Sequence, residues 1–268
     1  AGGSGSPNVT IRFGYSSDDK IYVFYIAGGS MVWEFATNAE FRDTNGWYHI
    51  VVRYDSTQSS ATDRLRIYVN GTQQTFSNST NSSQNITPTM NSAVAHYIGN
   101  NNASNYFDGC MSHVHFADGQ SLEPSVFGST DSTTGEWKIN TSPSFTLGTN
   151  GFTILKDGNT ITDQSSNSND FTSSGAGVTK TEDCPSNVFA TLNSLNTNDA
   201  DQTFSNGNTK QAVSGNWLGI SSTIAVNSGK YYWEVKNSGG GNFGAGIGKE
   251  GVNGTSTKYF STNNNWLF

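Results

Sequence analysis

Residues 45–71 read NGWYHIVVRYDSTQSSATDRLRIYVNG, and this stretch decides the fold class. Two apolar runs flank a polar loop, and in the second run Leu65, Ile67 and Val69 alternate with other residues. A period of two places these three side chains on one face of a β-strand. The run ends in Asn70-Gly71, a pair that tolerates positive φ and favours a type I′ hairpin turn. The stretch therefore predicts antiparallel strands.

The same rhythm continues on both sides of this hairpin. NVTIRFGY (8–15) alternates, and KIYVFYIA (20–27) is almost continuously apolar, as in a strand buried on both faces. HYIG (96–99) and YFDGCMSHVHFADG (106–119) are further strand candidates. Short strands joined by polar turns, without helical periodicity, predict a β-sandwich or barrel.

The second half of the chain is less regular. From about Ser129 to Asn198 apolar residues are sparse, and GFTILKDG (151–158) is the clearest strand candidate. The strand rhythm returns from about Thr203, in NWLGIS (216–221), KYYWEVKN (230–237) and NFGAGIGK (242–249). We therefore predict an irregular connector followed by a second group of strands.

The composition argues against two classes of protein. Only 13% of the 268 residues are charged, the formal net charge is −7, and Lys and Arg are scattered. A nucleic-acid partner would require clustered basic residues, so we expect none. No apolar run approaches the roughly 20 residues of a membrane span, so we expect no membrane insertion. The N-terminal AGGSGSP has no signal-peptide pattern, and we expect the sequence to be a fragment of a longer polypeptide.

Cys110 and Cys184 are the only cysteines, and neither belongs to a CxxC pair. Two cysteines do not make a disulfide framework. We expect two separate buried thiols, which suits a protein that folds in a reducing cytosol.

Five stretches carry a resemblance to known families. The hairpin at 45–71 and the segment YIGNNNASNYFDGCMSHVHFADGQSLEPSVFG (97–128) resemble, in this order, the central hairpin and closing strands of laminin-G-like, concanavalin A-like domains. NSGKYYWEVKNSGGGNFGAGIGKE (227–250) resembles the opening strands of a SPRY domain. Between them, SNSNDFT (166–172) and CPSNVFATLN (184–193) resemble the connector of marine bacteriophage structural proteins.

The resemblance implies an all-β chain in three parts. We expect a concanavalin A-like jelly-roll β-sandwich over residues 1–128, an irregular connector over 129–200, and the first part of a SPRY-like β-sandwich over 201–268. It also implies a virion component, such as a fibre, spike or head decoration, with a virion-surface or extracellular location.

The working hypothesis is non-catalytic adhesion. The partners would be a host cell-surface glycan or glycoprotein and other virion proteins, with the chain in a homo-oligomer. Three alternatives stay open: a purely structural capsid decoration or fibre spacer, a glycan depolymerase, and a secreted eukaryotic adhesion protein.

Catalytic motifs are weak in this sequence. Gly239, Gly241 and Gly244 match GxGxxG in letters, but a strand-like pattern follows instead of the helix that dinucleotide binding requires. Hydrolysis of β-glucans on this fold uses Glu-x-Asp-x-x-Glu, because alternate residues of a strand share a face. Glu34, Glu136 and Glu234 lie next to or near a Trp but have no acidic partner two residues away, so we predict no enzyme.

Two histidines form the clearest metal-like pair. His113 and His115 are two apart on an expected strand, but a stable zinc site requires further ligands. We therefore favour packing for this pair, and a structural role for His49, which occupies the family's strand position. Calcium remains an alternative to having no cofactor, with Asp108, Asn100 and Asn102 as its candidate oxygen ligands.

Sugar binding agrees best with the residue types. Aromatic rings cover the C–H face of a sugar, while Asn and Asp bond its hydroxyls. The candidate glycan-binding residues lie beside polar loops: Tyr106, Asn105, Trp217 and Trp266. For each aromatic residue, ordinary core packing is the alternative.

Overall fold

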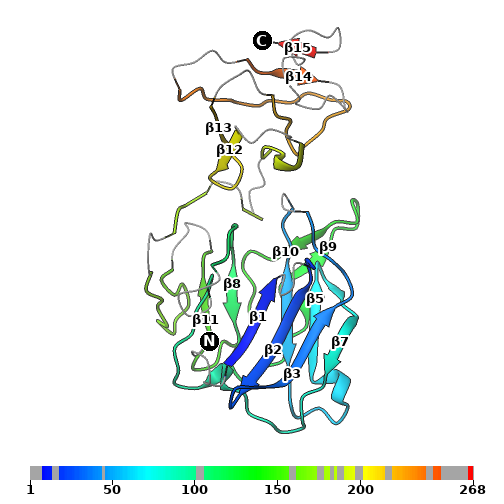
Figure 1. The fold of residues 1–268 in the computed structure, drawn as a ribbon, viewed down its shortest axis with the longest axis vertical. Helices are drawn as coiled ribbons and strands as arrows, with labels where there is room; N and C mark the ends of the chain where they lie inside the picture. The colour runs from blue at the N-terminus through cyan, green and yellow to red at the C-terminus, as the bar shows by residue number, and fades with distance from the viewer. Residues whose placement is uncertain are drawn as a thin grey trace. The chain divides into compact units, whose positions relative to one another are not determined.

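The computed structural model is all-β, with short 3-10 turns between strands, and this confirms the predicted fold class (Figure 1). It describes residues 8–13, 18–43, 46–100, 106–156, 161–173, 178–181, 184–185, 190–196, 202–214, 219–239, 244–248 and 265–267. The chain divides into two compact units, residues 1–178 and 179–268. The predicted domain boundaries at residues 128 and 200 stay a prediction.

The larger sheet of the first unit contains four antiparallel strands. They lie in the order β1 (Asn8–Phe13), β2 (Ile21–Ala27), β3 (Ser30–Thr37) and β7 (Phe76–Thr80) (Figure 1). Gly28 and Gly29 have φ values of +59° and +76° and form the tight turn between β2 and β3.

The second sheet is the predicted hairpin at 45–71. β4 (Ile50–Tyr54) pairs with β5 (Leu65–Val69), and β6 (Thr72–Gln73) follows after the Asn70-Gly71 turn. Both turn residues have positive φ, +47° and +76°, as the type I′ prediction requires. The polar loop contains one 3-10 turn, η1 (Ala61–Asp63).

The hydrophobic core contains side chains from both sheets. β2 and β3 contribute Ile21, Val23, Tyr25, Trp33 and Phe35, and β5 contributes Leu65, Ile67 and Val69, all at most 7% exposed. Tyr22, Phe24 and Ala36 form a smaller buried cluster with the partly buried Ile26. β2 is therefore buried on both faces, as its continuous apolar sequence predicted.

The segment after residue 96 forms less strand than predicted. Residues 96–99 are a loop, in which His96 Nδ1 and Nε2 contact the carbonyl oxygens of Val94 and Met90. Within 106–119, only β8 (Val114–Phe116) is a strand. Two further 3-10 turns, η2 (Thr89–Asn91) and η3 (Pro124–Val126), lie on either side of it along the chain.

The first part of the predicted connector is folded onto the first unit. β9 (Gly128–Thr130) pairs with β10 (Trp137–Ile139), and β11 (Phe152–Ile154) pairs with β8. β11 lies inside the predicted strand at 151–158. The described residues of 128–156 therefore contain three short strands, each three residues long.

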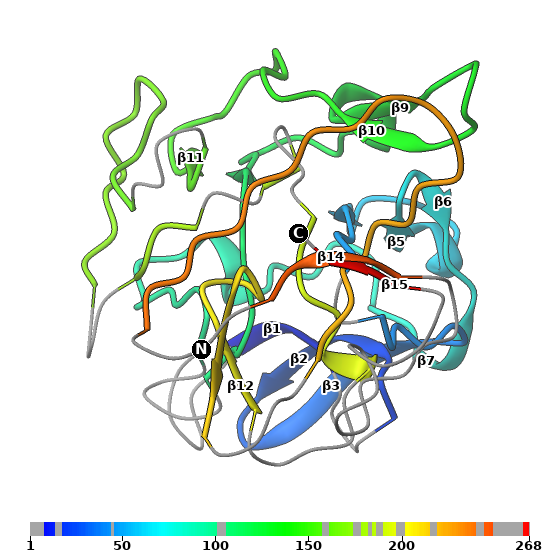
Figure 2. The same cartoon turned by 90° about the horizontal axis from the view of Figure 1, so that it is seen from above.

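The described residues of the second unit include two antiparallel strand pairs. β12 (Gln202–Ser205) pairs with β13 (Lys210–Val213), and β14 (Gly246–Gly248) lies beside β15 (Asn265–Leu267) (Figure 2). One 3-10 turn, η4 (Ser194–Asn196), and an isolated bridge between Leu192 and Ser222 precede β14.

The predicted strand at 230–237 is in no sheet among the described residues. Its aromatic side chains are exposed, with Tyr231 at 61%, Tyr232 at 83% and Trp233 at 45%. Apolar alternation alone does not make a strand, since backbone hydrogen bonds must come from a neighbouring strand.

Candidate functional site

The structure describes one of the four predicted glycan-binding side chains. Tyr106 is 68% exposed, and the adjacent Phe107 ring lies 6.4 Å from the ring of Phe13. Asn105, Trp217 and the side chain of Trp266 lie outside the described residues. A role of Tyr106 in binding stays a prediction.

The calcium candidates are also described only in part. Asp108 is exposed, Asn100 is half-buried, and Asn102 lies outside the described residues. In the described ranges, no three His, Cys, Asp or Glu side chains gather in a way that could hold a metal ion. Calcium binding by this loop stays a prediction.

His113 and His115 do not share one strand face. His113 has φ +51°, in the left-handed region, and precedes β8, so the period of two fails at this position. Its Nδ1 lies 2.7 Å from Ser112 Oγ, whereas His115 Nδ1 lies 2.9 Å from Thr153 Oγ1.

The ring of His115 packs between two phenylalanines. It stacks on Phe127 at 6.0 Å and meets Phe145 edge-on at 5.8 Å. Burial, with the nearby charges of His113 and Lys156, lowers the pKa of His115 to about 4. His115 is therefore a neutral packing residue at neutral pH.

Cys110 and Cys184 are not joined by a disulfide, and both are half-buried rather than fully buried.

None of the described 3-10 turns has the length and apolar character that crossing a membrane requires.

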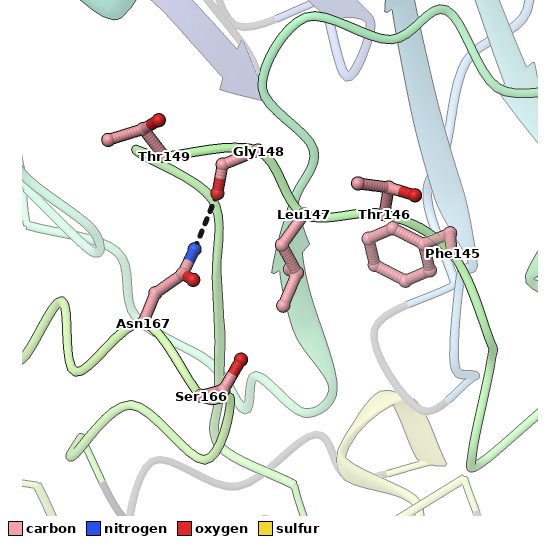
Figure 3. A pocket seen from close by; sticks show the side chains of 7 residues that line it. All are labelled: Phe145, Thr146, Leu147, Gly148, Thr149, Ser166 and Asn167. Atoms are coloured by element: carbon pink, nitrogen blue, oxygen red, sulfur yellow. Dashed lines mark hydrogen bonds between the residues drawn. The ribbon is translucent and has the colours of Figure 1, made fainter.

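One concave feature among the described residues is an open hollow of about 740 Å³ (Figure 3). Its wall consists of two short segments of the predicted connector: Phe145, Thr146, Leu147, Gly148 and Thr149, with Ser166 and Asn167. Sequence reasoning placed no site here, because the segment has few apolar residues and no strand rhythm.

Asp163 holds the second wall segment in shape. This residue is 8% exposed, and its carboxylate accepts the backbone N–H groups of Thr153, Ser165 and Asn169, each at 2.9 Å. It also accepts the hydroxyl of Ser165 at 2.8 Å. Burial alone would raise the pKa of Asp163, but these donors outweigh burial and hold the pKa below its usual value.

Two asparagine amides join the second wall segment to the first. Asn167 Nδ2 donates to the carbonyl oxygens of Gly148 and Gly151 at 2.6 and 2.9 Å, and Figure 3 shows the first of these bonds. Asn169 Nδ2 donates to Thr149 O and Gly151 O at 3.1 and 2.9 Å. The two wall segments are therefore held together by side-chain hydrogen bonds, and the hollow is not a gap between independent loops. The alternation of Asp163, Ser165, Asn167 and Asn169 is the sequence signal, since these types bond nearby backbone.

A polar cluster borders the first wall segment. Asp118 accepts hydrogen bonds from the Asn91 side chain and from the backbone and side chain of Asn150. Gly148 has φ +73°, and a Cβ atom there would overlap the backbone of Asp118. The cluster thus lies directly against the hollow and requires glycine at this point.

Similarity to known proteins covers the part of the chain that precedes the hollow. Residues 1–126 match the laminin G family model described as the concanavalin A-like lectin/glucanases superfamily. Searches of curated proteins and of solved structures gave no match. The match supports a laminin-G-like domain in this part of the chain, and the residues lining the hollow lie outside the matched range.

Proposed function

We propose that this chain is a binding protein whose hollow at residues 145–149 and 166–167 takes a carbohydrate ligand. The supporting observation is the wall itself, which combines the ring of Phe145 with hydroxyl, amide and backbone polar groups. This combination suits a sugar, which has apolar C–H faces and hydroxyl edges. A neighbouring domain of a lectin and glucanase superfamily agrees with carbohydrate or protein binding.

The proposal is a non-catalytic one. The carboxylates beside the hollow already have fixed partners: Asp163 accepts four donors, and Asp118 accepts from Asn91 and Asn150. A retaining glycosidase requires two carboxyl groups about 5 Å apart, one free to attack and one free to donate a proton. Glu34 on β3 accepts from the amide of Asn78, which also agrees with a structural carboxylate.

In its biological setting, the binding would attach a virion to a host. The resemblance to bacteriophage structural proteins motivates this step, with a host cell-surface glycan or glycoprotein as ligand. A homo-oligomer attached to other virion proteins would present several hollows together, and multivalency would raise the avidity of weak single sites.

A glycan array probed with the intact protein tests the proposal, followed by titration of the best ligand. Ser166→Trp places a large ring in the hollow and should weaken binding at least tenfold. Ser59→Trp is the matched control, because Ser59 is an exposed serine in the β4–β5 loop and lines no part of the hollow. Its binding should equal that of the wild type.

Three other results would contradict the proposal. If Ser166→Trp leaves ligand binding unchanged, the binding site lies outside the hollow. New reducing ends after incubation with a bound polysaccharide would indicate a depolymerase. Absence of glycan binding, with retention of virion-protein binding, would favour the spacer hypothesis.

A further inference from the structure

The side chains that line the hollow carry no charge. Phe145 and Leu147 are apolar, Thr146, Thr149 and Ser166 are hydroxyl residues, and the rest are Gly148 and Asn167. A sulfate or carboxylate group in this hollow would lose water without gaining a cationic partner, which is costly.

Several polar atoms of this wall are uncommitted. In the described part of the chain, the hydroxyls of Thr146, Thr149 and Ser166 form no hydrogen bond. Asn167 uses its Nδ2 for two backbone carbonyls, and this fixes the amide orientation and leaves Oδ1 without a donor. The three hydroxyls can donate and accept hydrogen bonds, and the amide oxygen can accept them. This set matches the hydroxyls of a sugar, each of which can also donate and accept a hydrogen bond.

The surroundings of the hollow are acidic. The Cβ of Asp118 lies against Gly148, and the buried carboxylate of Asp163 bonds the backbone of Ser165, next to Ser166. The nearby basic side chain, Lys156, donates from Nζ to Ser142 Oγ at 3.0 Å and does not line the hollow. None of the residues that line the hollow carries a positive charge, so an anionic ligand there would lie near Asp118 and Asp163 without a cationic partner in the wall.

We propose that the hollow selects uncharged sugar units and rejects sulfated and carboxylated ones. This inference rests on the proposed function and specifies the class of glycan. The predicted selectivity depends on the uncharged wall and on Asp118 and Asp163, the two aspartates beside it.

The experiment compares pairs of glycans that differ only in a sulfate or a uronate group, using the intact protein. For each neutral glycan bound, its anionic counterpart should bind at least tenfold more weakly. Two variants of one exposed residue provide the matched test: Thr149→Lys adds a cation at the wall, and Thr149→Gln adds similar length without charge. Thr149→Lys should bind the anionic members at least tenfold more tightly than Thr149→Gln does.

The two proposals fail in different ways. Anionic members that bind as tightly as neutral ones, with binding lost in Ser166→Trp, would overturn the selectivity and leave glycan binding in the hollow intact. Binding that Ser166→Trp does not affect, or absence of glycan binding, would overturn the proposed function and the selectivity with it.

Discussion

The indole Nε1 of Trp137 donates a hydrogen bond of 3.0 Å to Nδ1 of His49, while the two rings stack 5.9 Å apart at 16°. This contact joins β10 to the residue that precedes β4, across 88 positions of sequence. Because His49 Nδ1 accepts a proton donor, the imidazole must be neutral with its proton on Nε2. Burial lowers the pKa of His49 and maintains that state.

Gly71 should tolerate no side chain, because a Cβ atom there would overlap the indole of Trp137. We expect Gly71→Ala to lower the free energy of unfolding by about 2–4 kcal/mol, from positive-φ strain and steric overlap together. Gly135→Ala is the control, since Gly135 has φ +75° but open space around its Cβ position. Urea denaturation measures the free energy of unfolding of both variants. An equal decrease in both would mean that the indole of Trp137 moves aside at no energetic cost.

Acid should weaken the first unit through His115. Its pKa is about 4 in the folded chain and about 6.5 when unfolded. Between these values the unfolded chain binds a proton that the folded chain does not, so stability is full above pH 6.5 and falls as the pH drops towards 4. His115→Phe should reduce this fall, because it removes the titrating imidazole and keeps an aromatic ring between Phe127 and Phe145. Denaturation at pH 7.5, 5.5 and 4.5 measures the difference, and parallel curves for wild type and His115→Phe would refute it.

Asp163 should be indispensable to the hollow. Asp163→Asn replaces one acceptor oxygen by an N–H donor that faces other donors, and we expect a loss of about 1–3 kcal/mol. Asp108→Asn, at an exposed carboxylate, should change stability by less than about 0.5 kcal/mol. Hydrogen exchange at residues 145–151 would report local loosening in Asp163→Asn. Unaltered exchange there would show that the wall segments hold together without this carboxylate.

Trp33 offers a test of the core. Its side chain is fully buried, and its Nε1 has no hydrogen-bond partner in the described part of the chain. Trp33→Ala should cost about 3–5 kcal/mol through lost contacts and a cavity. Trp33→Phe should cost less than half as much, because it removes an unsatisfied donor together with part of the ring. Similar losses for both variants would indicate that the indole N–H is satisfied.

The first sandwich could be predicted because its signals are local. The alternation of Leu65, Ile67 and Val69 and the Asn70-Gly71 turn each fix structure within a few residues, and the computed fold confirms both. The continuous apolar run at 20–27 gave the doubly buried strand for the same reason.

The hollow could not be predicted, because its structure depends on side-chain bonds to distant backbone. Asp163 bonds the N–H of Thr153, ten residues away, and Asn167 bonds the carbonyl of Gly148, nineteen residues away. The alternation of polar residues at 163–169 indicates bonds to backbone, but it does not show that the partners are Thr153 and Gly148. Tyr106 is exposed, but exposure alone does not show which ligand it would contact.

None of the residues that line the hollow belongs to the apolar clusters of the two sheets. All members of these clusters precede residue 87 in the sequence. Replacement of a wall side chain such as Thr149 or Ser166 therefore leaves the packing of Trp33 and its neighbours untouched. Point mutations could therefore diversify the wall of the hollow while the scaffold stays unchanged. The same separation makes this rim a place to engineer new affinities by loop exchange.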